Sequence, residues 1–234
     1  MAVVVLDKIN KSFNRNQVLS KLSFQIKENQ ITGLIGKNGA GKSTCMKIIS
    51  GLLAPDSGSV IVLDKSLYPH NHLVKKEIGY LPENNPLPDQ MRVKHYLEFR
   101  GSLKQLRKKP RKNAIDEVVQ LLKLDSVYNS FIGNLSTGYR QRTGLAAVFL
   151  GWPRLLILDE PVRGLDPVQI ISLRKIILEA AKKCTLIISS HGLDELERIT
   201  ERFIFLQNGK IEHDGSLPAG QSLREYFLQS EENN

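Results

Sequence analysis

Short apolar runs alternate with longer amphipathic stretches along most of this chain. The runs are three to five residues long, and several lack polar alternation, which is typical of strands buried on both faces of a sheet. They are Val3–Leu6, Leu22–Ile26, Ile31–Ile35, Val60–Leu63, Leu155–Leu158, Leu186–Ile188 and Phe203–Leu206. Because helical patterns separate the later runs, the sequence predicts an α/β protein with a mostly parallel sheet.

The first 30 residues depart from this scheme, because no helical pattern separates their apolar runs. Turn signals at Asn14–Asn16 and Glu28–Gln30 predict an antiparallel β subdomain at the N-terminus. Near the other end of the chain, Asp166 followed by Pro167 predicts the start of a crossover helix, since Asp caps a helix well and Pro fits its first position.

The middle of the chain has a third pattern. From Pro82 to Leu150 we find no strand, but Val93–Leu103 and Ile115–Leu122 carry helical periodicity, which predicts a helical subdomain inserted into the α/β core. A chain of 234 residues permits one large domain or two small ones. We expect a single domain, divided into an α/β core at residues 1–81 and 151–215, a helical subdomain at 82–150, and a C-terminal helix and tail at 216–234.

Composition excludes several classes of protein. Apolar residues make up 41% of the chain and charged residues 24%, which is ordinary for a folded globular protein and not for a disordered or fibrous one. We find neither a run approaching 18 apolar residues nor a secretory signal pattern. Cys45 and Cys184 are too few and too far apart for a disulfide framework. We therefore expect a cytoplasmic protein.

The chain is basic, with 33 Lys and Arg against 24 Asp and Glu and a net charge of +9. This balance suits nucleic acid, a membrane surface or anionic small molecules, and it does not choose among them. Six of the basic residues fall between Lys104 and Lys112, around Pro110. We interpret this basic run as a solvated connector between two helices, because blocks of like charge usually face water.

The segment from Gly36 to Thr44 fits the phosphate-loop pattern G-x-x-x-x-G-K-S/T, between a predicted strand and a predicted helix. Its glycines let backbone N–H groups surround phosphate oxygens, and the helix N-terminus favours an anion. Lys42 would reach the β and γ phosphates, and Ser43 would offer its hydroxyl to Mg²⁺. The expected phosphate-binding residues are Gly36, Asn38, Gly39, Ala40, Gly41, Lys42, Ser43 and Thr44.

Two acidic residues, Asp159 and Glu160, follow the predicted strand Leu155–Leu158. Ligands of open α/β sheets bind at the carboxyl ends of the strands, so this position suits a catalytic site. Asp159 would hold Mg²⁺, usually through water, and Glu160 would act as the general base that polarises an attacking water. Together with the phosphate loop, the pair indicates a P-loop NTPase.

A further motif narrows the class. The segment Leu135–Arg142, with the sequence Leu-Ser-Thr-Gly-Tyr-Arg-Gln-Arg, resembles the LSGGQ signature of ATP-binding cassette (ABC) ATPases. The resemblance extends in order from Phe13 to His191. It implies that Phe13 stacks on the adenine of ATP, that Glu83 occupies the Q-loop position, and that His191 is the switch histidine.

The resemblance also assigns a role to the signature itself. It implies that Ser136 and Gly138 meet the γ-phosphate of ATP bound to a second, head-to-tail copy of the chain. Thr137 and Tyr139 depart from the family pattern, as does Glu83, which replaces a glutamine. Since Ser136 and Gly138 are retained, we expect an active ATPase, and Glu83 remains a candidate ligand of Mg²⁺.

Each of three residues also has a purely structural interpretation. Phe13 fits a core aromatic, Ser136 fits a helix N-cap, and His191 fits a hydrogen-bonded loop histidine. An N-cap serine and a phosphate ligand are compatible roles, because a helix N-terminus presents unpaired N–H groups to an anion.

The resemblance implies an ATP-binding and ATP-hydrolysing subunit that forms homodimers and docks on a separate permease at the cytoplasmic face of the cell membrane. The segments Tyr80–Leu87 and Gly164–Pro167 look like those of exporters of the gliding-motility and multidrug type, so we favour export over import. One alternative is a cassette protein that acts on ribosomes or nucleic acid, although we expect no nucleic-acid partner. A P-loop small-molecule kinase is another.

Overall fold

The computed structural model describes residues 1–68, 71–190, 192–218 and 220–232, and it contains two β-sheets. The first sheet is antiparallel and has the order β2-β1-β4-β5. Its strands are β1 (Ala2–Phe13), β2 (Asn16–Lys27), β4 (Ser57–Val62) and β5 (Lys65–Ser66). The N-terminal antiparallel subdomain predicted from the sequence is therefore confirmed.

The second sheet has the order β10-β9-β3-β8-β7-β6. Its strands are β3 (Ile31–Ile35), β6 (Ile78–Leu81), β7 (Leu155–Asp159), β8 (Thr185–Ser189), β9 (Arg202–Gln207) and β10 (Lys210–Gly215). Pairing is parallel from β9 across to β6, and only β10 runs antiparallel to its neighbour. The prediction of a mostly parallel sheet is confirmed.

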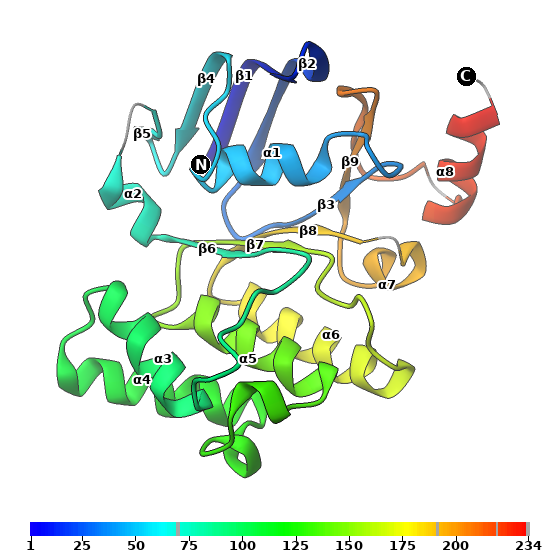
Figure 1. Ribbon diagram of the computed structural model, residues 1–234. Coiled ribbons are helices and arrows are strands. Elements are labelled where there is room, and N and C mark those ends of the chain that lie inside the picture. Colours follow the sequence, from blue (N-terminus) through cyan, green and yellow to red (C-terminus); the bar gives the residue numbers. More distant parts are fainter. Residues whose placement is uncertain (69–70, 191, 219, 233–234) are drawn as a thin grey trace.

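Helices cover both faces of the parallel sheet (Figure 1). One helix, α1 (Lys42–Ile49), lies between the two sheets, and α3 to α6 form a layer on the opposite face. The remaining bounds are α2 (His72–Lys76), α3 (Val93–Leu103), α4 (Lys108–Leu122), α5 (Thr137–Phe149), α6 (Pro167–Ala181), α7 (Leu193–Glu197) and α8 (Leu223–Glu232). Short 3₁₀ turns, Asp125–Val127 and Ile132–Asn134, precede α5.

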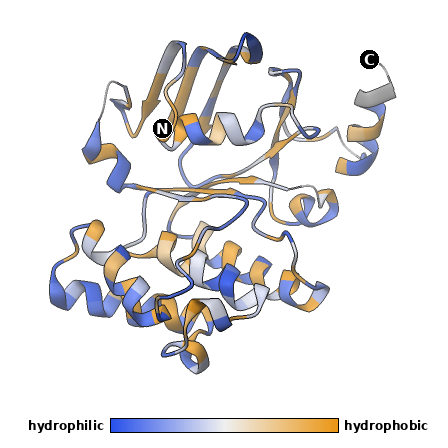
Figure 2. Cartoon of the chain, in the orientation of Figure 1, coloured by the Kyte–Doolittle hydropathy of each residue, from blue (hydrophilic) through white to orange (hydrophobic). Residues whose placement is uncertain are grey.

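The apolar run of β7 is buried on both faces. Leu155 and Ile157 join the core between the two sheets, whereas Leu156 and Leu158 join the core between the parallel sheet and the helical layer. This alternation explains why the run has no polar positions. Figure 2 shows the same pattern, with apolar positions on the central strands and polar positions over much of α4.

The sequence did not reveal β6, which is only four residues long and contains Gly79. A Cβ at Gly79 would lie 2.8 Å from the carbonyl oxygen of Val148 and 2.7 Å from the side chain of Leu156. The strand therefore needs glycine for its close approach to α5, at the cost of a typical strand pattern.

The interpretation of Lys104–Lys112 as a solvated connector is wrong in part. Helix α4 begins at Lys108, so the second half of the basic run is helical, with Lys108, Lys109 and Lys112 exposed. Lys104 is half-buried, and its Nζ donates hydrogen bonds to the carbonyl oxygens of Val148 (3.1 Å) and Leu150 (2.7 Å) at the end of α5. A lysine suits this place because the last carbonyls of a helix lack backbone partners.

Burial lowers the pKa of Lys104 from 10.5 to about 8. Between these two pH values, the unfolded chain therefore binds more protons than the folded chain. The free energy of unfolding rises with pH across this window, because the cost of burying a charged Lys104 disappears as the side chain loses its proton. We expect the free energy of unfolding of the parent, relative to that of Lys104→Met, to increase by on the order of 2 kcal/mol between pH 7.5 and pH 10. Urea unfolding at both pH values measures this difference.

The exposed Lys108 provides the control. The free energy of unfolding of Lys108→Met should change between the two pH values by the same amount as that of the parent. An equal pH dependence in the parent and Lys104→Met would contradict the burial of a charged Lys104.

Candidate functional site

The phosphate loop joins the end of β3 to the start of α1. Gly36 has φ +155°, and a Cβ there would lie 2.2 Å from the carbonyl oxygen of Leu206, so only glycine fits. The Nζ of Lys42 donates hydrogen bonds to the carbonyl oxygens of Gly36 (2.6 Å) and Lys37 (3.1 Å). Burial lowers the pKa of Lys42, while Glu160 and Asp159 act in the opposite direction. The ammonium group thus lies within the loop that it would serve.

The predicted acids lie at the carboxyl end of β7, as expected. One oxygen of Asp159 accepts a hydrogen bond from Ser189 Oγ (2.7 Å), and the other accepts one from the Tyr80 hydroxyl (3.4 Å). Ser189 Oγ in turn accepts one from the backbone N–H of Glu160 (3.0 Å). Ser189 ends β8 and Tyr80 lies on β6, so the two strands beside β7 hold its acids in place.

Sequence reasoning missed Ser189 and Tyr80 as parts of the site. The signal that finds them is the strand order, which places the ends of β6, β7 and β8 side by side. Burial, together with the nearby carboxylate of Asp159, raises the pKa of Tyr80, so its hydroxyl stays protonated and remains a donor.

A cavity of about 380 Å³ brings most of the predicted nucleotide-binding residues together. They are Phe13, Asn38, Gly39, Gly41, Lys42, Ser43, Thr44, Glu83, Asp159 and Glu160. Gly36 and Ala40 belong to the same loop but do not line the cavity, and Ala40 is buried. Asn16, Val18 and Lys37 also line the cavity and were not predicted. His191 lies outside the described residues.

Phe13 is not a core aromatic, because it is 45% exposed at the turn between β1 and β2. Lys11 lies over its ring, with the ammonium nitrogen 5.5 Å from the ring centre. An exposed ring at the mouth of a phosphate-binding cavity suits stacking on a nucleotide base.

The oxygens in this cavity are those that Mg²⁺ prefers. Ser43 offers a hydroxyl, and Asp159 and Glu83 offer carboxylates. The described part of the chain has no cluster of three His, Cys, Asp or Glu side chains that would hold a metal ion alone. Since Mg²⁺ is typically bound by one or two carboxylates together with substrate phosphates, the residues fit a metal that binds with a nucleotide.

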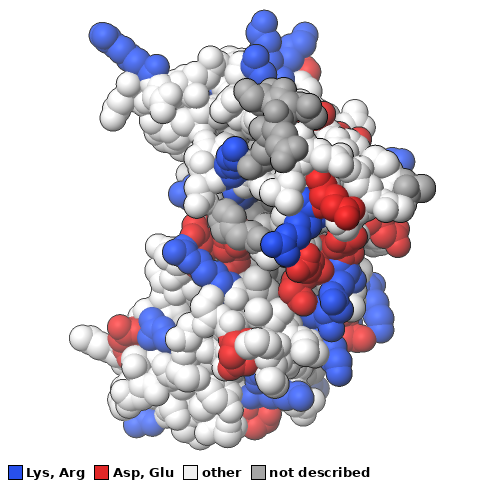
Figure 3. Space-filling view, turned by 90° about the vertical axis from the view of Figure 1, so that its right-hand side faces the viewer, with Lys and Arg blue, Asp and Glu red and all other residues white. Residues whose placement is uncertain are grey.

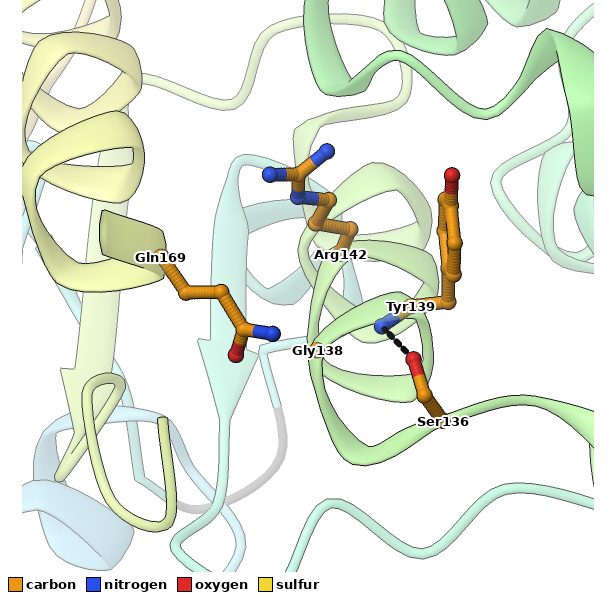
Figure 4. Close-up of a pocket in the computed structure, with 5 residues that line it drawn as sticks. All are labelled: Ser136, Gly138, Tyr139, Arg142 and Gln169. Carbon is orange, nitrogen blue, oxygen red and sulfur yellow. Dashed lines mark hydrogen bonds between the residues drawn. The ribbon is translucent and has the colours of Figure 1, made fainter. Parts of the chain in front are cut away.

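The signature segment lies beside a second cavity, of about 210 Å³ (Figure 4). Ser136 caps α5, and its Oγ accepts a hydrogen bond from the backbone N–H of Tyr139 (3.5 Å). The side chains of Arg142, from α5, and of Gln169, from α6, lie on the side of Gly138 that faces away from Ser136 and Tyr139 (Figure 4). A Cβ at Gly138 would lie 2.8 Å from the amide of Gln169, which explains the glycine.

Among the described residues, no side chain lines both cavities. The structure therefore separates Ser136 and Gly138 from the phosphate loop of the same chain. Gln169 was not predicted as a neighbour of the signature. Asp166, as expected, caps α6 by accepting a hydrogen bond from the backbone N–H of Gln169 (2.8 Å).

Comparison with known proteins identifies the family. The sequence profile described as ABC transporter matches residues 19–163, more than half of the chain. The chain belongs to the ABC transporter family. It is one of the ATP-binding and ATP-hydrolysing cassettes of that family, whose phosphate loop, signature and acidic strand end are all present.

Individual relatives agree with this assignment. The chain is 32% identical to the Nod factor export ATP-binding protein I of Rhizobium sp. (strain N33), covering 92% of this chain and 72% of that protein. It is also 32% identical to ATP-binding cassette sub-family A member 2 of Rattus norvegicus, but it spans only 9% of the length of that protein. A solved ATP-binding subunit of an ABC transporter superposes with a TM-score of 0.89 at 27% identity, covering 97% of this chain and 98% of that one.

Lys42 provides the direct test of the nucleotide site. Lys42→Ala removes the ammonium group from the phosphate loop, so we expect ATP binding to weaken by at least tenfold and hydrolysis to fall close to background, while the circular dichroism spectrum is retained. Calorimetric titration with ATP measures the loss. Lys27→Ala, at an exposed residue of β2, is the control and should bind as the parent does. Unchanged binding in Lys42→Ala would contradict the assignment.

Proposed function

We propose that two copies of this chain bind ATP head to tail and use its hydrolysis to drive export through a separate membrane permease. The observation that carries the proposal is the separation of the nucleotide cavity from the signature cavity within one chain. A second copy completes each site by presenting its signature to the nucleotide. The Nod factor relative, whose name includes export, supports the direction of transport.

We assign the following roles within a completed site. Lys42 and the N–H groups of the phosphate loop bind the terminal phosphates, and Ser43 with Asp159 would hold Mg²⁺, which neutralises phosphate charge. Glu160 orients and polarises the attacking water. Ser136 and Gly138 of the partner copy donate hydrogen bonds to the γ-phosphate from the N-terminus of α5, where the helix dipole favours negative charge. On family resemblance, His191 also contacts the γ-phosphate.

The net charge of +9 does not gather into one basic field on the face shown in Figure 3, where acidic and basic side chains are interspersed. Proteins that bind nucleic acid usually present a basic patch or stripe. This face therefore does not favour the alternative in which the cassette acts on ribosomes or nucleic acid.

We place the permease at a groove of about 520 Å³ beside α1, α2, β6 and α3. Lys47, Lys75 and Arg100 contribute positive charge to the groove, and Leu52, which is 68% exposed, contributes apolar surface. Tyr96, Phe99, Arg100 and Leu103 of α3 follow helical i, i+3, i+4, i+7 spacing, so Phe99 and Leu103, 50% and 61% exposed, extend this apolar surface.

The groove suits an amphipathic cytoplasmic segment of the permease with acidic and apolar side chains. The polypeptide after β6 connects it to the nucleotide cavity, since Pro82 and Asn84 line the groove while Glu83 lines the cavity. No helix in the described parts of this chain is both long and apolar enough to cross a bilayer. The proposal assigns the membrane-spanning part of the transporter to the permease and places this chain at the cytoplasmic face of the permease.

Mixed dimers test the head-to-tail arrangement. Ser136→Arg should abolish hydrolysis with less than threefold loss of ATP affinity, because it blocks closure and leaves the phosphate loop intact. In a mixed dimer with Lys42→Ala, one site carries both changes and the other carries neither, so hydrolysis should partly return. ATPase assays of each variant alone and of the mixture measure this recovery.

The exposed Ser102 of α3 lines neither cavity, so Ser102→Arg is the control and should keep parental hydrolysis. Glu160→Gln removes the proposed general base, so it should bind Mg-ATP without hydrolysing it and accumulate as a dimer. The arrangement would be contradicted if this variant formed no dimers in Mg-ATP and if hydrolysis by the parent were strictly proportional to its concentration at all dilutions.

Apolar side chains beside the groove test the docking surface. Leu52→Glu and Phe99→Glu should reduce co-purification with the permease at least fivefold, because each adds a charge that repels an acidic segment. ATP hydrolysis by the isolated chain should stay within twofold of the parent. For this test, the permease is sought among the proteins encoded beside this chain, as one with about six apolar segments of about 20 residues.

Leu228 of α8 is 53% exposed and does not line the groove, and α8 lies far from α2 and α3 in Figure 1, so Leu228→Glu is the matched control. Equal loss of the permease in all three variants would argue against a specific docking surface.

A further inference from the structure

An ion pair joins Glu83, at the nucleotide cavity, to Arg163. Glu83 follows β6 and Arg163 follows β7, and these strands are parallel neighbours, so their following segments emerge at the same edge of the sheet. The pair therefore follows from the strand order. The proposed mechanism gives Arg163 no role.

The ion pair matters because the nucleotide cavity is rich in negative charge, which repels the phosphates of ATP. Three carboxylates line the cavity, those of Glu83, Asp159 and Glu160. Asp159 accepts hydrogen bonds from two hydroxyl groups, which leave its charge in place. An unneutralised Glu83 would add repulsion against the triphosphate of ATP, because like charges in a partly desolvated cavity interact strongly. Arg163 places a positive charge on the one carboxylate of the three that replaces an uncharged family residue.

The pair is too exposed to be an important support of the fold. The side chain of Arg163 is 66% exposed and that of Glu83 is 38% exposed. Ion pairs in such positions typically stabilise a protein by about 0–1 kcal/mol. A competing cation can therefore replace Arg163 at little cost in stability.

The segment that carries Arg163 also approaches the signature. Gly164 has φ +74°, and a Cβ there would lie 3.6 Å from the methyl group of Thr137, the first residue of α5. Within this segment, the backbone N–H of Arg163 donates to the carbonyl oxygen of Glu160 (3.1 Å). Arg163 thus belongs to a short turn that leads from Glu160, at the nucleotide cavity, toward Thr137 of the signature segment.

We propose that Arg163 is a positioning residue that neutralises Glu83 beside the nucleotide cavity, and that Glu83 exchanges Arg163 for the metal when the nucleotide arrives as Mg-ATP. When metal is scarce, Arg163 then reduces the repulsion between the Glu83 carboxylate and the triphosphate, so that the affinity for ATP is maintained. The inference rests on the proposed nucleotide site, but it requires neither the second copy nor the permease.

Equilibrium binding of ATP to the full chain tests the proposal without any measurement of hydrolysis. Titration calorimetry is performed in EDTA and in excess Mg²⁺. In EDTA, Arg163→Met should weaken ATP binding about tenfold, and Arg163→Lys should restore at least half of the lost free energy. In Mg²⁺, Arg163→Met should change the affinity less than threefold, because Glu83 then has the metal as its partner.

The Glu83→Gln background separates neutralisation of Glu83 from direct attraction between Arg163 and phosphate. Glu83→Gln alone should bind ATP in EDTA within about threefold of the parent, because Arg163 already neutralises Glu83 in the parent. Adding Arg163→Met to it should change the affinity less than twofold. A tenfold loss in this background would overturn the proposal, because Arg163 would then act on the nucleotide directly.

A second exposed ion pair provides the matched control. Arg154, 53% exposed, pairs with Glu28, 40% exposed, and neither residue lines the nucleotide cavity. Arg154→Met should leave ATP affinity unchanged in both conditions. An equal loss in Arg154→Met and Arg163→Met, or equal losses for Arg163→Met with and without Mg²⁺, would overturn the inference. Failure of the parent to bind ATP in either condition would instead overturn the nucleotide site itself.

Discussion

The parallel pairing of β3, β8, β7 and β6 is the constraint on which the nucleotide cavity depends. The carboxyl ends of parallel strands share one edge, so the segments that follow them converge there although they are far apart in sequence. The phosphate loop follows β3, the acids end β7, Ser189 ends β8, and Glu83 follows β6 shortly after the strand ends. A single hydrogen-bonding pattern thus assembles the cation, the carboxylates and the hydroxyl donors of the site.

The helical layer adds a constraint of a different kind. Helix α5 packs on the opposite face of the parallel sheet from α1, with Leu145 and Phe149 buried in the core between layer and sheet. Its N-terminus therefore lies beside α6 and not beside the phosphate loop, as Ser136 and Gln169 show. A signature held in this position is accessible to a second copy of the chain. Because α5 is packed tightly in the core, the orientation of its N-terminus is fixed by the fold.

The sequence predicted those parts of the site whose residues lie within one continuous stretch of the chain. Lys42 and Asp159 each stand in a local pattern whose meaning depends only on an adjacent strand or helix. The partners that orient them come from other strands, and Ser189 becomes informative only when the strand order is known. Charge patterning misplaced Lys104 for a related reason, since its burial depends on carbonyl groups of α5 that lie more than 40 residues away. The ion pair between Glu83 and Arg163 was likewise invisible.

Two of the three carboxylates that line the nucleotide cavity, those of Asp159 and Glu83, are prepared for a cation in different ways. Asp159 is held by neutral hydroxyl groups of Ser189 and Tyr80, which orient its carboxylate and leave its negative charge in place. Glu83 is instead paired with the cation Arg163, so a metal would compete with Arg163 for this carboxylate. A metal that approaches both would therefore meet a ready ligand at Asp159 and a competitive exchange at Glu83. Arg163 immediately precedes Gly164, which approaches Thr137 at the start of α5, so this exchange would take place one residue from the point where the turn meets the signature segment.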